Sequence, residues 1–364
     1  MPRQTQVMKA LPELIRAEIA MNGFMRFDRF MELALYCPES GYYEQQRDTV
    51  GRRGDFITSV STGELFGQLL AFQFAGWLEE LRVADCGLRI VEAGAHDGKL
   101  AKDILSWLES NRPGLFQQLH YVILEPSKRR QAWQMEALKS FAPRVRWLSQ
   151  LDGSTVQPST GIIFSNELLD AFPVRRFGWN AAEKKWFEWG VTAAAGKFVW
   201  AKIQHPEFRI QHPELEAVLP DNYTVEASPA AENWWRQAAG NLARGKLLAI
   251  DYGFTEDERF SPARTNGTLR AYFRHRVSDD LLSNVGGQDL TAHVNFSAIQ
   301  KAGEEAGLTT ENVCTQPQFL TRILERAVRE KSFGEWSAGR ARQFQTLTHP
   351  EHLGRAFRVL VQSR

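Results

Sequence analysis

Short apolar runs, each followed by a stretch with helical spacing, recur through the middle of the chain. Residues 88–92 form such a run before Gly94, and residues 99–108 follow with the spacing of an amphipathic helix. Similar apolar runs return at residues 121–124, 145–148, 162–164, 246–251 and 357–361. Continuous apolar strands that alternate with helices predict a mostly parallel sheet covered by helices on both faces.

Two other patterns of apolar and polar residues flank or interrupt this one. Apolar residues at helical spacing predict helices near residues 11–22, 27–34 and 65–81, with a glycine-punctuated segment before the third. Residues 174–204 instead alternate apolar and polar positions around a turn at 195–197, which predicts an antiparallel hairpin. We therefore expect an α/β protein with a doubly wound, mostly parallel sheet, an N-terminal helical portion and an antiparallel β insertion.

We expect the domain boundaries where the pattern of apolar and polar residues changes. Residues 1–85 form the N-terminal helical portion and the glycine-rich segment, and residues 86–173 form the first part of the sheet core. The antiparallel and helical insertion covers residues 174–244, and residues 245–364 complete the core.

Composition narrows the class of protein. The 364 residues include 44 Lys plus Arg and 43 Asp plus Glu, without the basic excess that is typical of a nucleic-acid binder. The three cysteines (Cys37, Cys86 and Cys314) form no C-x-x-C pair, so neither a disulfide framework nor a metal site is expected. No apolar run reaches the roughly 18–20 residues of a membrane-spanning helix, and an apolar signal core is lacking, so we expect a cytoplasmic protein.

The turn after the first buried strand carries the most informative spacing. It reads Glu92-Ala93-Gly94-Ala95-His96-Asp97-Gly98 and leads into a helix, which is where a nucleotide-like ligand approaches the backbone in a doubly wound sheet. A dinucleotide fingerprint would need glycine at positions 96 and 99, but His96 and Lys99 stand there. A turn at Gly94 with a second glycine at Gly98 instead suits S-adenosylmethionine, which has no pyrophosphate to bind.

Two further residues bear on this cofactor hypothesis. Glu125 ends the second buried strand, where a carboxylate can accept bonds from both ribose hydroxyls, although an acid in this position can also simply be solvated. His96 has three interpretations: a side chain turned to solvent, a direct cofactor contact, or a block to binding. We favour the first.

A second group of polar residues follows the fourth strand, Asn166-Glu167-Leu168-Leu169-Asp170. This strand end lies on the same edge of the expected sheet as the glycine loop. Methyl transfer needs alignment and electrostatic support, and a guanidinium nucleophile needs carboxylates that hold the cation and accept a proton. Glu167 and Asp170 have that chemistry, but Asp170 could instead cap a short helix while Glu167 is structural. Asp251 adds a carboxylate to the same edge after the fifth strand.

Several segments, taken in order, resemble the MidA family of methyltransferases, whose mitochondrial members are complex I assembly factors that methylate arginine. The segments are Gly41-Tyr42-Tyr43, Gly54-Asp55-Phe56-Ile57-Thr58-Ser59, Phe66-Gly67, Glu92 to Leu100, Asn166 to Pro173, Asp251-Tyr252-Gly253, Gly267-Thr268-Leu269-Arg270, His275, and Gly287 to Val294. The resemblance spans residues 10–362. Its specificity comes from the joint order and spacing of the segments.

The resemblance implies a class I S-adenosylmethionine-dependent methyltransferase that acts on an arginine-containing protein, such as a respiratory-complex subunit. The residues expected to serve catalysis are Asp55, Glu167 and Asp170. Those expected to bind the cofactor are Glu92, Gly94, His96, Gly98, Glu125, Asn166 and Thr58. Three positions depart from the family pattern: His96 replaces a glycine, Val60-Ser61-Thr62 replaces a Pro-Glu-Ile run, and Asn295 stands in place of an aspartate.

Two hypotheses from different classes follow. The first is a methyltransferase that acts on a protein arginine. The second is a catalytically weak or inactive member of the family that serves as a binding or assembly factor, as the loss of a glycine and a glutamate near the site suggests. A nicotinamide dehydrogenase is a distant third, because positions 96 and 99 are not glycine.

Overall fold

The computed structural model describes residues 10–45, 58–81, 87–151, 159–203, 215, 217–273, 276–354 and 356–364. The chain divides into two compact units, each built from separate stretches of sequence. The first comprises Met1–Arg47, Ala171–Ala230 and Arg259–Ala292, and the second comprises Asp48–Asp170, Ala231–Glu258 and His293–Arg364.

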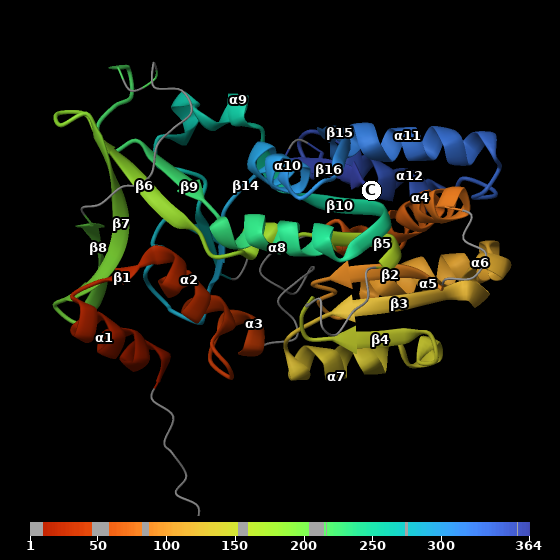
Figure 1. Cartoon of the computed structure of the whole chain (residues 1–364), viewed down its shortest axis with the longest axis horizontal. Coiled ribbons are helices and arrows are strands. Elements are labelled where there is room, and N and C mark those ends of the chain that lie inside the picture. The colour runs from red at the N-terminus through yellow and green to blue at the C-terminus, as the bar shows by residue number, and fades with distance from the viewer. Residues whose placement is uncertain are drawn as a thin grey trace, which may run out of the picture. The chain divides into compact units, whose positions relative to one another are not determined.

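Within the described ranges, the second unit contains an eight-stranded sheet with the order β15-β16-β10-β5-β2-β3-β4 and with β14 paired to β10 (Figure 1). The strands are β2 (Leu88–Ala93), β3 (Leu119–Leu124), β4 (Val145–Leu148), β5 (Ser159–Asn166), β10 (Leu242–Phe254), β14 (Val294–Asn295), β15 (Thr309–Thr315) and β16 (Phe357–Ser363). Neighbours from β4 to β10 pair in parallel, and β16 runs antiparallel to both β10 and β15. The predicted α/β fold with a mostly parallel sheet is confirmed.

Helices surround this sheet. Those that lie wholly or mostly in the second unit are η1 (Val60–Thr62), α4 (Leu65–Leu81), α5 (Lys99–Asn111), α6 (Pro113–Gln118), α7 (Lys128–Ala137), η2 (Lys139–Phe141), η3 (Leu169–Ala171), α8 (Pro229–Gly240), α9 (Glu256–Arg259), α10 (Phe296–Glu305), α11 (Gln316–Arg329) and α12 (Ala338–Thr348). α4 is apolar on most sides and is largely buried, as its sequence predicts. Its side chains join one core with those of α5, α11 and the central strands.

The strand order creates a topological switch point. β3 and β4 extend the sheet from one edge of β2, and the chain then returns to add β5 and β10 at the opposite edge of β2. In an open α/β sheet, ligands bind outside the carboxyl ends of the strands at such a point. The segments that follow β2, β3, β5 and β10 are therefore where a ligand site is expected.

The first unit has a different architecture. Its elements are α1 (Leu11–Asn22), β1 (Met25–Arg26), α2 (Phe27–Tyr36), α3 (Tyr42–Gln45), β6 (Arg175–Asn180), β7 (Lys185–Ala194), β8 (Lys197–Ile203), β9 (Thr224–Ala227), η5 (Pro262–Arg264), β11 (Arg270–Phe273), β12 (Arg276–Ser278) and β13 (Asp289–Thr291). Strands β6, β7 and β8 pair antiparallel, which confirms the predicted hairpin texture. β1 extends the same sheet by pairing with β7, so the N-terminal helices pack on the inserted strands in one core.

Among the described residues, no helix combines the length and the apolar character needed to cross a membrane.

Candidate functional site

The glycine loop leaves β2 through a tight turn that needs unusual backbone conformations. Gly94 and Gly98 have φ of 73° and 83°, in the left-handed region that glycine adopts without steric cost. The N–H of Gly98 donates to the carbonyl of Ala95 at 2.7 Å and closes the turn. A Cβ on Gly94 would lie 2.8 Å from a methyl group of Leu168, so a side chain at this position would require the end of the Leu168 side chain to move.

His96 takes the same left-handed conformation without being glycine, with φ of 47°. Its Nδ1 lies 3.9 Å from a carboxylate oxygen of Asp97, and its side chain is about one quarter exposed (26%). Burial acts to raise the pKa of Asp97, but the hydrogen bond and the charge of His96 and nearby backbone N–H groups outweigh it and lower that pKa. The imidazole therefore lies beside Asp97 within the loop, and its role toward a ligand stays a prediction.

Glu92 lies inside the sheet, one residue before the end of β2. Its carboxylate accepts a hydrogen bond of 2.6 Å from the hydroxyl of Tyr121 on β3. Burial raises the pKa of Glu92 to about 8, although the bond from Tyr121 acts to lower it. The sequence assigned Glu92 to the cofactor, and the structure pairs its carboxylate with Tyr121 of the neighbouring strand, so its role toward a cofactor stays a prediction.

Glu125 follows β3 and is buried, with only 4% of its surface exposed. This burial overturns the alternative of a solvated acid. One carboxylate oxygen accepts from the N–H of Ser127 at 3.0 Å, and the other accepts from the amide of Gln134 at 3.1 Å. The carboxylate therefore has a fixed orientation at the carboxyl end of β3.

Asn166 is the last residue of β5 and Glu167 follows it, and both have buried polar atoms at this edge of the sheet. Oε1 of Glu167 accepts from the N–H of Ser59 at 3.0 Å and from the amide of Asn166 at 3.2 Å. Among the described residues, Oε2 of Glu167, Oδ1 of Asn166 and Oγ of Ser165 are buried without a hydrogen-bond partner. Because buried polar atoms normally have partners, these three indicate that something polar binds here.

The conformation and protonation of Glu167 are both unusual. Its φ is 51°, which a non-glycine residue rarely adopts and which costs about 1–2 kcal/mol. Burial raises its pKa to about 8, the bonds from Ser59 and Asn166 act to lower the pKa, and the charge of Asp251 adds to the rise. Backbone strain and a shifted pKa in one residue are typical of functional sites.

Asp251, on β10, holds the turn that follows Glu167. Its Oδ2 accepts from the backbone N–H groups of Leu168, Leu169 and Asp170 at 3.0, 2.8 and 3.4 Å. The sequence offered Asp170 as a possible cap of a short helix. In the structure these N–H groups at η3 are capped by the carboxylate of Asp251, while Asp170 lies within η3 and its role stays a prediction. Burial raises the pKa of Asp251 to about 7, although four backbone N–H groups act to lower it.

The segment before α4 reaches the same cluster through its backbone. Thr58 and Ser61 exchange hydrogen bonds between side chain and backbone, and the hydroxyl of Thr62 donates to the carbonyl of Ser59 at 2.8 Å. Val60-Ser61-Thr62, which departs from the family pattern, thus forms a short 3₁₀ turn, and the N–H of Ser59 just before it donates to Glu167. Asp55, which the sequence assigned to catalysis, lies outside the described residues, as do Gly54, Phe56 and His275.

The structure explains the third departure as well. Asn295 caps α10, because its Oδ1 accepts from the N–H of Ala298 at 3.2 Å. Its amide also donates to Glu256 at 2.7 Å. An aspartate could accept the first bond but could not donate the second, so asparagine suits a position beside a glutamate.

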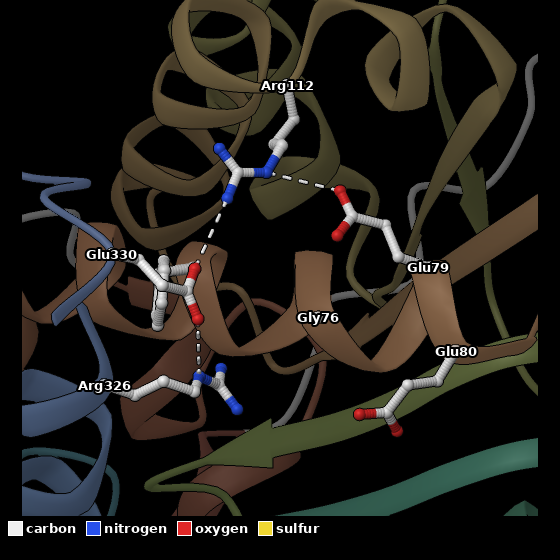
Figure 2. Close-up of a pocket in the computed structure, with 7 residues that line it drawn as sticks. Gly76, Glu79, Glu80, Arg112, Arg326 and Glu330 are labelled. Atoms are coloured by element: carbon white, nitrogen blue, oxygen red, sulfur yellow. Dashed lines mark ion pairs between the residues drawn. The ribbon is translucent and has the colours of Figure 1, made fainter.

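A separate cavity of about 480 Å³ lies elsewhere in the second unit (Figure 2). It is lined by Phe72, Gly76, Glu79, Glu80, Arg112, Arg326 and Glu330. Arg112 pairs with Glu79 at 3.2 Å and with Glu330 at 3.9 Å, and Arg326 lies 3.8 Å from Glu330. These partly exposed groups pair with one another, and none of the predicted site residues lines the cavity.

Sequence reasoning overlooked two residues of the site. Gln134 is completely buried on α7, and Ser59 is completely buried before α4. Ser59 belongs to a segment that resembles the family but received no role there, and Gln134 belongs to no motif. Only the tertiary structure brings Ser59 to Glu167 and Gln134 to the glycine loop. Among the described residues, no group of three or more His, Cys, Asp or Glu side chains is arranged to hold a metal ion.

This fold is that of a doubly wound α/β protein with a topological switch point at the carboxyl edge of its sheet. A family described as "Putative S-adenosyl-L-methionine-dependent methyltransferase" matches residues 69–314, which is more than half of the chain. The chain belongs to this family, and S-adenosylmethionine is the family's cofactor.

Solved structures and curated proteins agree with this assignment. A Burkholderia thailandensis protein crystallised with S-adenosyl-homocysteine is 35% identical, with a TM-score of 0.84 over 97% of this chain and 92% of its own. The Drosophila melanogaster "Protein arginine methyltransferase NDUFAF7 homolog, mitochondrial" is 24% identical over 96% of this chain and 84% of its own. The human "Protein arginine methyltransferase NDUFAF7, mitochondrial" is 27% identical over 79% and 67%. The predicted class I methyltransferase fold, family and cofactor are confirmed.

Proposed function

We propose that the protein transfers a methyl group from S-adenosylmethionine to a nitrogen of an arginine in a protein substrate. The observation that carries this proposal is Glu167, a half-buried residue at the switch point of the sheet whose Oε2 is itself buried and has no hydrogen-bond partner among the described residues. The printed names of the Drosophila and human relatives support the choice of arginine.

The residues at the edge fit the cofactor. Gly94 and Gly98 let the backbone turn tightly where the methionyl part would pass, and Glu125 presents an oriented carboxylate where the ribose hydroxyls would lie. Asn166 and Thr58 are the further residues assigned to it. When bound, the cofactor supplies an electrophilic methyl group on a sulfonium sulfur.

The residues on the substrate side fit a guanidinium group. Arginine has five N–H donors and a positive charge, and the acceptors Oε2 of Glu167 and Oδ1 of Asn166 are buried without partners among the described residues. A cation beside Glu167 stabilises its ionised form, so the carboxyl group loses its proton as the substrate binds. In the reaction one N–C bond forms, one S–C bond breaks and the nitrogen loses a proton, which the ionised Glu167 accepts. Asp170 and Asp55 remain proposed to assist.

The proposal also includes the partner and its compartment. Because the chain resembles complex I assembly factors, a respiratory-complex subunit that contains arginine is the first protein to test. The cysteine pattern supports a cytoplasmic, reducing environment.

The test combines binding with turnover. Calorimetry with S-adenosyl-homocysteine measures cofactor binding, and transfer of a labelled methyl group is compared on peptides that contain either arginine or lysine. We expect transfer to arginine alone, and at least a 100-fold loss of turnover in Glu167→Gln with little change in cofactor affinity. Glu109→Gln, an exposed acid on α5, is the matched control and should retain activity. Transfer to lysine, or full activity of Glu167→Gln, would contradict the proposal.

One observation favours a second function, a binding or assembly factor with little turnover. In the glycine loop the backbone is expected to approach the cofactor, and His96 adds a side chain at this point. This alternative predicts that wild-type protein binds the protein partner and transfers no methyl group to it, and that His96→Gly improves cofactor affinity. Methyl transfer at ordinary rates by the wild-type protein would exclude it.

A further inference from the structure

Gln134 connects the two segments that approach the cofactor. This side chain is completely buried on α7, and its Nε2 donates to the carbonyl oxygen of His96 at 3.0 Å and to Oε2 of Glu125 at 3.1 Å. A side-chain amide has two N–H donors, so one group can satisfy both acceptors. The glycine loop and the acid after β3 are therefore tied to the same nitrogen atom.

The amide cannot be reversed without losing a further bond. The indole Nε1 of Trp147, on β4, donates to Oε1 of Gln134 at 3.0 Å. Because indole is only a donor, it must face the oxygen end of the amide, which leaves the NH₂ end to face His96 and Glu125. Trp147 thus determines the orientation in which Gln134 serves both acceptors.

The bond to His96 supports a strained part of the loop. His96 has φ of 47°, a conformation that is costly for a residue with a side chain, and the bond from Gln134 holds its carbonyl in that arrangement. The bond to Glu125 is a hydrogen bond to a carboxylate, which is stronger than one between neutral groups. A carboxylate accepts up to about four hydrogen bonds, so internal bonds can orient it without preventing it from accepting the hydroxyls of a ligand.

We infer that Gln134 is a positioning residue for the cofactor, which fixes the Glu125 carboxylate for the ribose hydroxyls while it holds the His96 carbonyl of the glycine loop. The inference rests on the proposed methyltransferase function. It assigns to a buried polar residue on α7 a role in cofactor affinity that acts through the ribose.

The experiment measures two ligands against matched variants by calorimetry. The ligands are S-adenosyl-homocysteine and its 2′-deoxyribose analogue. Gln134→Met keeps the length of the side chain and removes its hydrogen bonds. Gln131→Met is the control, because Gln131 lies on the same helix, is buried, and donates to the backbone carbonyl of Glu125 and not to its carboxylate.

We expect Gln134→Met to bind S-adenosyl-homocysteine about 10- to 100-fold more weakly than wild type, as for a lost bond to a charged group. The loss of affinity should be several-fold smaller for the deoxy analogue, because this ligand lacks one of the two hydroxyls that would donate a hydrogen bond to Glu125. Gln131→Met should lose less than about 3-fold for either ligand. An equal loss for both ligands in Gln134→Met, or no loss, would overturn the inference.

A second variant keeps the test independent of folding. Trp147→Phe leaves Gln134 in place but removes the donor that orients its amide, so a smaller loss of about 2- to 5-fold is expected, again greater for the ribose than for the deoxyribose ligand. Should Gln134→Met fail to fold, unchanged affinities in Trp147→Phe would overturn the inference. Wild-type protein that binds no S-adenosyl-homocysteine would overturn the proposed function and this inference together. Wild-type binding with no ribose-dependent loss in the variants overturns only the inference.

Discussion

Glu167 should make the folded protein less stable as the pH rises, and Glu167→Gln should remove that effect. Its pKa is raised from 4.5 to about 8 in the folded state, chiefly by burial. Between these two values the folded protein retains a proton that the unfolded chain has lost. The favourable contribution is therefore fully present below the unfolded pKa and is lost as the pH rises through about 8.

The size of the effect follows from the width of this window. Each pH unit within it changes the free energy of unfolding by about 1.4 kcal/mol per group. Between about pH 5.5 and about pH 8, Glu167 alone should remove about 3 kcal/mol of stability from the wild type. Glu92 and Asp251 have raised pKa values for the same reason and add to the slope, so Glu167→Gln should flatten only part of it.

Urea unfolding followed by tryptophan fluorescence measures this directly, because the chain has 11 tryptophans. The free energy of unfolding is determined at several pH values for the wild type, Glu167→Gln and the surface control Glu109→Gln. The difference between Glu167→Gln and wild type should grow with pH in favour of the variant and stop growing above about pH 8. Parallel profiles for wild type and Glu167→Gln would show that Glu167 titrates normally, and the reasoning about its burial would be wrong.

Three further substitutions test other parts of the site. His96→Gly removes about 1 kcal/mol of backbone strain but gains a similar entropy in the unfolded chain, so stability should change little. Because we expect the imidazole to face solvent, calorimetry should also show little change in S-adenosyl-homocysteine affinity; tighter binding would favour the binding-factor alternative, and weaker binding would mean that the imidazole contacts the ligand. Asp251→Ala leaves the backbone N–H groups of Leu168, Leu169 and Asp170 without their acceptor and should lower the free energy of unfolding in urea by about 3 kcal/mol. Asp251→Asn keeps an acceptor oxygen and should lower it by less. Equal losses in the two variants would contradict the capping role of Asp251. Asn295→Asp introduces a second carboxylate beside Glu256 and should lower the free energy of unfolding by about 1 kcal/mol. Asn295→Ser keeps a capping oxygen and should lower it by less. An Asn295→Asp variant as stable as the wild type would show that Glu256 does not disfavour an aspartate at this position.

The sheet could be predicted from sequence because its strands are buried on both faces. Such strands appear as uninterrupted apolar runs, and the runs at residues 145–148 and 88–92 match β4 and β2 almost residue for residue. β15 lies at the edge of the sheet and begins with four consecutive polar residues, 309–312, so no apolar run of useful length indicates it. α11 carried a recognisable signal that the sequence reading did not use, a capping box between Thr315 and Gln318 before a strongly amphipathic stretch.

The site was predictable only where strand ends determine it. Gly94, Glu125 and Glu167 were chosen as candidate site residues because each follows a recognisable strand, and parallel strands bring their carboxyl ends to one edge. The partners of these residues are determined by tertiary structure. Asp251 caps a turn from 81 to 83 residues away in sequence, and the N–H of Ser59 reaches Glu167 across 108 residues. No local pattern encodes such contacts.

The raised pKa values of the acids bear on which substrates the proposed site can accept. Two ionised carboxylates, Glu167 and Asp251, held together away from water would cost several kcal/mol, and a protonated Glu167 avoids that cost in the absence of substrate. A guanidinium group brings the positive charge that makes ionisation of Glu167 favourable, so proton loss and substrate binding are coupled. A neutral acceptor would leave the proton in place and Glu167 unable to act as a base. In the proposed mechanism, the protonation state of Glu167 would therefore make the site favour a cation over a neutral nucleophile.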